Sequence, residues 1–329
     1  MKALVYTGPE QLDYRDALDP VPGGDPLIRV AHVGICGSDM HAWGGHDERR
    51  PAPLILGHEA AGTIVEGPSQ GRRVTVNPLV TCGVCADCRA GRENLCARRQ
   101  IISMPPREGA FAQLIAMPAG NLVAIPDRVP TEKAALAEPI ACGWHAVRLA
   151  RRMLNGPLED ARCLVLGGGA IGLGAALVLA AHGASDIWLG EVHPARRALV
   201  ARVGDFRVFD PREEGSGPRD VDLVVDGVGF ASTRAAASAA VKPGGVIVHI
   251  GLGSAEGGLD IRRMTLQEIA FIGTYTYSQA DFRATAQAIF DGRLGTLDWP
   301  EVRPLSEGAR AFADIKAGRV AAPKVILVP

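Results

Sequence analysis

The stretch Ala161–Ala184, "ARCLVLGGGAIGLGAALVLAAHGA", decides the fold of this chain. Its apolar start predicts a buried strand, the glycines predict a tight turn, and the apolar run after them predicts a helix. The turn fits the pattern G-x-G-x-x-G between a strand and a helix, which is the context in which this pattern binds a dinucleotide. The alternative interpretation is a glycine-rich turn in some other α/β protein.

In the dinucleotide interpretation, each glycine of the motif has a physical role. We expect Gly167 to make the tight turn, Gly169 to let a pyrophosphate approach the backbone, and Gly172 to let the helix pack against the sheet. The N-terminus of that helix would donate hydrogen bonds to the phosphates. An acidic residue, Glu191, ends the next predicted strand, "IWLGEV", as the motif requires.

The residue at the end of that second strand predicts which cofactor is bound. The carboxylate of Glu191 is expected to hold the adenosine ribose hydroxyls and to repel a 2′-phosphate, which favours NAD over NADP. Arg196 and Arg197 temper this preference, because an arginine can bind a 2′-phosphate. The residues expected to contact the cofactor are Gly167, Gly169, Ala170, Ile171, Gly172, Glu191, Arg196, Gly227 and Gly251.

Working outward from the motif, the chain divides into regions of different pattern. Predicted strands and helices alternate after residue 137, which indicates a parallel sheet in an α/β fold. Residues 1–137 instead show short alternating segments separated by Gly and Pro, typical of a β-rich barrel or sandwich. The segment 206–227 leaves little room for a full helix between two strands of the parallel sheet.

Length and composition limit the classes of function. A chain of 329 residues suggests two domains, and a net charge of −1 provides no field that favours nucleic acid or an anionic membrane. The chain opens on a strand-like alternation without a signal peptide, and the apolar run Ala170–Ala181 is too short to span a bilayer. We therefore expect a cytoplasmic protein.

Four of the seven cysteines lie in "TCGVCADCRAGRENLC", at the spacing C-x2-C-x2-C-x7-C. Clustered thiols in a reducing compartment bind metal more often than they form disulfides, and four thiolates suit a closed, tetrahedral zinc site of structural type. The alternatives are a redox pair or buried thiols without a partner. The predicted ligands are Cys82, Cys85, Cys88 and Cys96.

A second candidate metal site combines two short segments, "VGICGSDMHAW" and "ILGHEAAG". A thiolate, an imidazole and a carboxylate from Cys36, His58 and Glu59 are a suitable ligand set for a catalytic zinc, which keeps one position open for substrate. Taken singly, Cys36 would more often be a buried thiol and His58 a core histidine. Their combination favours a site.

These motifs together resemble the zinc-dependent medium-chain alcohol dehydrogenases, and most closely the polyol branch of sorbitol, idonate and threonine dehydrogenases. The resemblance rests on "GICGSDMH", "GHEAAG", the four-cysteine segment, "AEPIACGWHAV" and "GGGAIG", and it runs nearly end to end. It implies a GroES-like catalytic domain at 1–137, which contains the zinc lobe 81–96. A Rossmann domain would follow at 138–276, and residues 277–329 would return to the catalytic domain.

The resemblance also implies roles for single residues. Cys36 and His58 match the two constant ligands of the catalytic zinc, and the third ligand is either Glu59 or Glu138. Asp39 matches a carboxylate that orients the zinc-bound histidine.

Three further residues have roles that rest on the resemblance alone. Ser38 would hydrogen-bond the substrate hydroxyl, and His41 would pass its proton outward. Lys324 matches a basic residue near the cofactor pyrophosphate.

The function implied is oxidation of a secondary alcohol of a polyol, sugar alcohol or sugar acid to a ketone, with NAD and two zinc ions per chain. The alternatives are a zinc dehydrogenase or reductase for simple alcohols and aldehydes, or a non-catalytic NAD(H)-binding sensor. The partners implied are a small-molecule alcohol and further copies of the chain, in a tetramer or dimer.

Several residues near the motifs have two open interpretations. Trp43, Phe111 and Tyr275 line the substrate pocket or belong to the core. Arg49 and Arg50 contact an acidic or phosphorylated substrate, or they are surface charges, which is the more common case.

Overall fold

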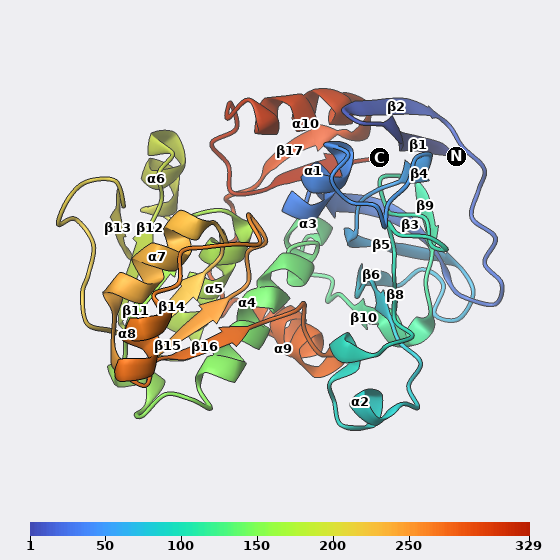
Figure 1. Cartoon of the computed structure of the whole chain (residues 1–329). Coiled ribbons are helices and arrows are strands. Elements are labelled where there is room, and N and C mark those ends of the chain that lie inside the picture. The colour runs from blue at the N-terminus through green and yellow to red at the C-terminus, as the bar shows by residue number, and fades with distance from the viewer.

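The computed structural model describes residues 1–329 and has two halves that lie side by side (Figure 1). One half contains a six-stranded parallel sheet with the order β13-β12-β11-β14-β15-β16. In sequence this is 3-2-1-4-5-6, the strand order of a doubly wound dinucleotide-binding sheet. These strands are β11 (Arg162–Leu166), β12 (Asp186–Gly190), β13 (Arg207–Phe209), β14 (Val221–Asp226), β15 (Val241–His249) and β16 (Ala270–Gly273).

The other half is built from antiparallel strands of the N-terminal region together with two strands from the end of the chain. Its larger sheet has the order β10-β6-β5-β3-β18-β17, and β9 also pairs with β3. Smaller sheets of order β2-β1-β4 and β7-β8 complete it. The strands are β1 (Lys2–Gly8), β2 (Gln11–Asp16), β3 (Leu27–Gly34), β4 (Leu54–Ile55), β5 (Glu59–Glu66), β6 (Arg73–Val76), β7 (Leu79–Val80), β8 (Gln100–Ile101), β9 (Leu114–Ala116), β10 (Leu122–Ala124), β17 (Glu301–Pro304) and β18 (Val325–Val328).

The helices cover the parallel sheet and connect the two halves. The α-helices are α1 (Gly37–Trp43), α2 (Ala86–Arg89), α3 (Thr131–Ala134), α4 (Ala137–Ala150), α5 (Ala170–Ala181), α6 (Pro194–Val200), α7 (Ala231–Ala240), α8 (Ile261–Leu266), α9 (Gln279–Phe290) and α10 (Gly308–Lys316). Short 3-10 turns are η1 (Glu93–Leu95), η2 (Ala119–Asn121), η3 (Leu158–Asp160) and η4 (Leu305–Glu307). None of the helices combines the length and the hydrophobicity that crossing a bilayer would need.

The decisive stretch folds as its pattern predicts. β11 is buried along four of its five residues, and α5 begins at Ala170 with Gly169 as its N-cap residue. Gly167 has φ +96°, a backbone conformation that strains any residue with a side chain. A Cβ atom on Gly172 would lie 1.9 Å from the carbonyl oxygen of Gly167, so the helix packs this closely only because Gly172 has none. The prediction of an α/β fold with a doubly wound parallel sheet is confirmed.

Two features of the connections bear on the predicted organisation. No helix lies between β13 and β14, which confirms that the segment 206–227 is too short for one.

The elements after residue 276 are divided between the two halves. Strands β17 and β18 pair with each other, and β18 pairs with β3 of the N-terminal sheet. Helix α9 instead shares its apolar core with α4 and α5. The domain boundaries at residues 137 and 276 stay predictions.

Candidate active site and metal centres

The candidate catalytic ligands meet where β3 and β5 pair. Cys36 follows β3 as the N-cap residue of α1, and His58 and Glu59 stand at the start of β5. The antiparallel register places Gly34 opposite Glu59, so the ends of the two strands lie together. One ligand atom from each of Cys36, His58 and Glu59 lies within 4.8 Å of the others.

The two carboxylate oxygens of Glu59 have different surroundings. Oε1 accepts a hydrogen bond from Lys324 Nζ at 2.6 Å, and this ammonium also donates to the carbonyl oxygen of Ile35 at 2.8 Å. Oε2 is buried and has no hydrogen-bond partner, which is costly unless something binds it. Burial alone would lower the pKa of Lys324, but the charges of Glu59 and Cys36 outweigh it and raise the pKa.

Asp39 holds the other two ligands in place. Its Oδ2 accepts a hydrogen bond from the Cys36 backbone N–H at 3.0 Å, and its Oδ1 accepts one from Gly57 at 3.2 Å and lies 3.4 Å from His58 Nδ1. Burial would raise the pKa of Asp39, but the charge of His58, the hydrogen bond to it and the charge of Arg50 lower the pKa to about 2. Because Nδ1 faces this carboxylate, Nε2 is the nitrogen of His58 left for a metal ion.

Glu138 approaches the same site from α4 but has a different partner. Its Oε1 accepts a hydrogen bond from the hydroxyl of Tyr277 at 2.7 Å, and it is not among the three ligands whose atoms converge. Burial is the main reason that its pKa is raised to about 7, and the charge of Glu59 adds to the rise. The charges of His58 and Lys324 and the hydrogen bond from Tyr277 each lower the pKa of Glu138, but each of these effects is smaller than that of burial.

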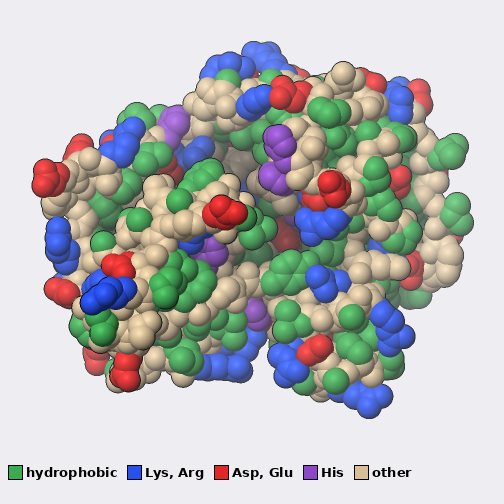
Figure 2. Space-filling model, in the orientation of Figure 1, with side chains coloured by type: hydrophobic (Ala, Val, Ile, Leu, Met, Phe, Trp, Pro, Cys, Tyr) green, Lys and Arg blue, Asp and Glu red, His purple; other side chains and the backbone are tan.

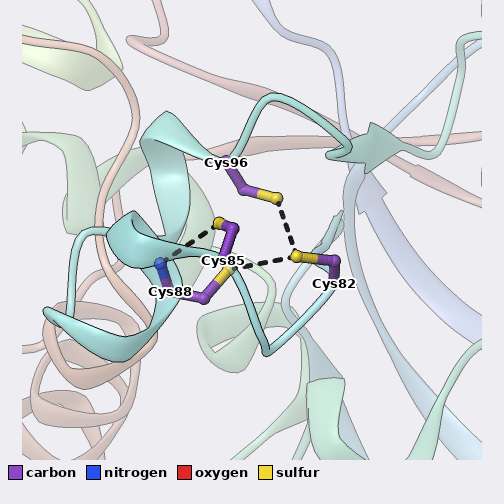
Figure 3. Close-up of side chains that lie close together, drawn as sticks. All are labelled: Cys82, Cys85, Cys88 and Cys96. Atoms are coloured by element: carbon purple, nitrogen blue, oxygen red, sulfur yellow. Dashed lines mark hydrogen bonds between the residues drawn. The ribbon is translucent and has the colours of Figure 1, made fainter.

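The four-cysteine lobe brings its sulfurs together (Figure 3). The Sγ atoms of Cys82 and Cys88 are 3.9 Å apart, and those of Cys82 and Cys96 are 3.6 Å apart. Four sulfurs placed tetrahedrally about 2.3 Å from one zinc ion would be about 3.8 Å apart, so this spacing fits zinc. The hydrogen bond from the Val84 backbone is the largest cause that lowers the pKa of Cys82 to about 6, which favours the thiolate form that binds metal.

The glycine loop and the end of β12 form the predicted cofactor site. Glu191 is buried there, and its two oxygens accept hydrogen bonds from Gly168 N–H at 2.8 Å and His193 N–H at 2.7 Å. Nothing lies within 4 Å of the space beside Gly169 that a side chain would occupy, as an approaching pyrophosphate requires. The loop therefore fits a dinucleotide.

Two comparisons with known proteins bear on these sites. Residues 22–127 match the model of the alcohol dehydrogenase GroES-like domain, and residues 170–291 match that of the zinc-binding dehydrogenases. The chain is 31% identical to L-galactonate-5-dehydrogenase of Escherichia coli, over 89% of this chain and 88% of the relative. It belongs to the zinc-binding alcohol dehydrogenase family.

Other relatives agree with this assignment. Sorbitol dehydrogenase of Bacillus subtilis is 34% identical over 84% of this chain and 83% of its own. A zinc-binding dehydrogenase from Sinorhizobium meliloti, solved with NADP, superposes with a TM-score of 0.88 at 28% identity and covers 100% of this chain and 99% of its own. The predicted family, its GroES-like and Rossmann-type domains and its zinc-binding character are thereby confirmed.

The remaining predicted residues of the dehydrogenase lie as follows. Ser38 and His41 are on α1, the helix that Cys36 caps, and they are three positions apart, so they share one face. The backbone of Gly227 lies against Gly172, and Gly251 lies against Gly229 at the end of β15. Lys324 contacts Glu59, while the preceding Pro323 accepts a hydrogen bond from Ala170 N–H at the glycine loop.

The arginines near the end of β12 are held by other groups. Arg196 donates to the carbonyl oxygens of Val320 and Ala321, which belong to the C-terminal tail. The nearest guanidinium nitrogen of Arg196 is 3.9 Å from Glu191 Oε2. Arg197 donates to Asp210 Oδ2 at 3.0 Å, so both side chains are already engaged by other groups of the chain.

The structure shows the environment of four residues that the sequence left with two interpretations, pocket or core for the aromatic residues and substrate contact or surface charge for the arginines. Trp43 and Phe111 are buried and pack against Phe312, which is the core alternative. Arg50 is not a surface charge, because it is buried and donates to the carbonyl oxygens of Ser38 and Ser103. Arg49 is exposed and pairs with Asp47.

Sequence reasoning missed two residues near the site, Tyr277 and Cys142, and it named Lys324 and Glu59 without predicting that they pair. Tyr277 and the Lys324–Glu59 pair had no local signal, because each contact joins segments more than 130 residues apart. Cys142 could have been found, since it lies one helical turn after Glu138 on α4, and two of the charges that raise its pKa are those of Glu138 and Cys36, after burial.

Proposed function

We propose that this dehydrogenase oxidises a secondary hydroxyl of a polyol or sugar acid to a ketone, at a zinc ion held by Cys36, His58 and Glu59. The observation that carries the proposal is the convergence of these three ligand atoms beside an unpartnered, buried Glu59 oxygen. The substrate class is supported by the relatives named for L-galactonate and sorbitol.

The chain's own residues would orient the substrate and move its proton. Zinc supplies Lewis-acid polarisation of the hydroxyl when bound, and the nicotinamide accepts the hydride. The hydroxyl of Ser38 would accept the substrate proton through a hydrogen bond, and the exposed imidazole of His41 would pass it to solvent. Asp39 would keep His58 in the orientation in which Nε2 is the ligand nitrogen.

For the third protein ligand, we propose Glu59 rather than Glu138. Support comes from the free Oε2 of Glu59, whereas Glu138 is occupied by the Tyr277 hydroxyl. For the cofactor, we propose NAD, because Glu191 stands at the end of β12 and the nearby arginines are engaged. Kinetics of the wild type with NAD and NADP would test the second point.

The proposal is tested by zinc analysis together with an NAD-reduction screen over polyols and sugar acids. Two zinc ions per chain with turnover of such substrates would support it. Turnover that is confined to simple alcohols and aldehydes would contradict the substrate class. No turnover after zinc has been restored would contradict the catalytic role and favour a cofactor-binding sensor.

We further propose that the protein is a cytoplasmic homo-oligomer. Strand β16 is an edge of the parallel sheet, and the exposed apolar side chains Phe271, Leu266 and Ile261 lie on it and on the preceding helix α8. Reduced thiols for two zinc sites suit a reducing compartment. Light scattering on the purified protein measures the first point, and cell fractionation the second.

A further inference from the structure

The hydroxyl of Ser38, which is proposed to bind the substrate hydroxyl, has no hydrogen-bond partner within the chain. Ser38 is half-buried in the first turn of α1, and only its backbone is held by another residue's side chain. The position of the hydroxyl is therefore set by the backbone that carries it. Figure 2 shows a hollow between the two halves of the molecule, and histidine side chains lie beside it where Figure 1 places α1.

A buried arginine holds the backbone of Ser38 from outside the helix. Arg50 is 3% exposed, and its Nη1 donates to the carbonyl oxygen of Ser38 at 2.7 Å, while its Nε donates to the carbonyl oxygen of Ser103 at 3.1 Å. The guanidinium therefore ties α1 to the segment that follows β8. Because a guanidinium is planar and rigid, its two hydrogen bonds fix both the distance and the direction between the two carbonyl groups.

The next residue of α1 is anchored separately. The carboxylate of Asp39 accepts hydrogen bonds from the backbone N–H groups of Cys36 and Gly57, so it ties α1 to the segment that leads into β5. Two consecutive residues of α1 are thus fixed to different parts of the fold. Loss of Arg50 would release Ser38 and leave the contacts of Asp39 with the ligand segments in place.

The second residue that Arg50 contacts, Ser103, has an unusual backbone. Ser103 is fully buried, its φ is +67°, and its hydroxyl has no hydrogen-bond partner. Serine seldom adopts this left-handed conformation, and a buried hydroxyl without a partner is costly. Both costs occur at the residue whose carbonyl oxygen accepts the hydrogen bond from Arg50. Such strain is found where a backbone group must face one particular partner.

Stability alone does not explain why Arg50 is buried. The one acidic group within ion-pair distance of its guanidinium is Asp47, whose carboxylate lies 3.7 Å from Nη1 and is already bound by Arg49 at 2.8 Å. Burying a charge costs free energy, and an apolar side chain of similar volume often stabilises a protein at least as well. An apolar side chain could not, however, hold the carbonyl oxygen of Ser38.

From these contacts we infer that Arg50 is a positioning residue of the dehydrogenase, which anchors the backbone of Ser38 to that of Ser103 and so fixes the hydroxyl that binds the substrate. The inference rests on the proposed function, in which Ser38 accepts the substrate proton. It assigns Arg50 no contact with the substrate or with zinc. Loss of Arg50 should therefore slow turnover without removing the metal or the cofactor.

The experiment compares Arg50→Met with the zinc-loaded wild type in NAD-reduction assays. The probe is the polyol or sugar acid that the wild type oxidises fastest, with sorbitol and L-galactonate tried first. In Arg50→Met, kcat should fall about 10- to 100-fold, because a misplacement of about 1 Å near the reacting atoms can cost this much. The zinc content and the dissociation constant for NAD should stay as in the wild type, since the metal ligands and the glycine loop keep their contacts.

Arg50→Lys separates the charge of the side chain from its anchoring geometry. An ammonium group carries the same charge but lacks the planar fork, so it cannot hold both carbonyl oxygens in the same geometry. We expect Arg50→Lys to recover the thermal stability lost in Arg50→Met more fully than it recovers kcat. Recovery of both in proportion would show a purely structural role and overturn the inference. If Arg50→Met does not fold, Arg50→Lys decides alone, and wild-type kcat in that variant would overturn the inference.

Arg73→Met is the matched control. Arg73 lies on β6 in the same half of the molecule, donates to the carbonyl oxygens of Pro126 and Val129 at 2.7 and 3.0 Å, and has Asp127 3.8 Å away. Its contacts thus resemble those of Arg50, but β6 carries neither a metal ligand nor Ser38. Arg73→Met should lose stability and keep kcat, and an equal loss of kcat in both methionine variants would overturn the inference.

The outcomes distinguish the inference from the function on which it rests. An unchanged kcat in Arg50→Met would overturn the inference and leave the proposed function standing, whereas a loss of kcat with zinc and NAD binding intact supports it. Turnover of no polyol or sugar acid by the zinc-loaded wild type would overturn the proposed function. The anchor is then tested by hydrogen exchange, which should be faster in α1 of Arg50→Met than in the wild type and unchanged in β11. Unchanged exchange in α1 would overturn the inference as well.

Discussion

The two thiol-containing sites of this dehydrogenase differ in how their charges are balanced. The four-cysteine lobe takes all its ligands from the segment 81–96, and two of the four, Cys82 and Cys85, are partly exposed. The site of Cys36, His58 and Glu59 is instead surrounded by buried charged groups, with Asp39, Lys324 and Glu138 in contact with it or beside it. The first site can hold metal by geometry alone, whereas the second needs partners from distant parts of the chain.

The largest effect on turnover is expected from Cys36→Ala, which removes a ligand of the buried site and leaves the four-cysteine lobe intact. Removing this ligand should lower turnover at least about 1,000-fold, because chemistry depends on the metal that it holds. NAD binding should persist, since the glycine loop is untouched, and zinc should fall from two ions per chain to one. Elemental analysis, NAD titration and steady-state kinetics measure these values.

Cys163→Ala is the matched control, because Cys163 is buried in β11 and belongs to neither metal site. It should retain two zinc ions and normal turnover. Full activity of a metal-free Cys36→Ala protein would contradict the catalytic role of the site.

The corresponding change in the other site is Cys88→Ala. We expect one zinc ion to be lost here too, but the consequence should be local unfolding rather than lost chemistry. A loss of about 2 kcal/mol would lower Tm by about 3 °C in a chain of this size. Hydrogen exchange should become fast in residues 81–96 and stay slow in β11 and β14. A drop in kcat as large as that of Cys36→Ala would contradict the distinction between the two sites.

A smaller effect is expected when the buried Lys324 is removed. Lys324→Met leaves the Glu59 carboxylate without its ion-pair partner, and breaking a buried pair costs about 3 kcal/mol or more. Zinc would compensate the carboxylate, so the loss of stability should be larger in metal-stripped protein than in zinc-loaded protein. Thermal unfolding of both forms measures the difference, and equal losses would argue against Glu59 as a metal ligand.

The smallest effect should come from Asp39→Asn. The amide keeps the size of the side chain but removes the negative charge that faces His58 Nδ1. Loss of such a partner lowers metal affinity by about 10- to 100-fold, so catalytic zinc should exchange faster with a chelator while the four-cysteine zinc stays bound. Equal retention of both ions would show that Asp39 does not orient the ligand.

The same contrast explains how much the sequence could predict. The four cysteines and the glycine motif could be predicted from the sequence, because the residues of each motif are close together in the chain. Their spacing is set by the zinc site and by the turn that they form. Cys36, His58 and Glu59 were found because two short segments carry them. The Lys324–Glu59 and Tyr277–Glu138 contacts depend on tertiary packing, and no spacing encodes them.

The partners of Arg50 and Arg196 could not be predicted from the sequence either. Arg50 was expected at the surface because charged residues usually are exposed, yet its hydrogen bonds to two backbone carbonyls make burial tolerable. Arg196 was placed correctly near the end of β12, but its bonds to the C-terminal tail could not be predicted, because they form between halves of the molecule.

The pairing of β18 with β3 has a consequence for how the protein is made. The ribosome synthesises Glu59 265 residues before Lys324, so the nascent chain carries a buried-site carboxylate without its cation over that whole stretch. The N-terminal sheet lacks two of its strands, β17 and β18, until residues 301–328 emerge. The sheet that carries the candidate catalytic ligands is therefore completed only after β18 has been synthesised, and a polypeptide that ends before Val325 would lack the strand that pairs with β3.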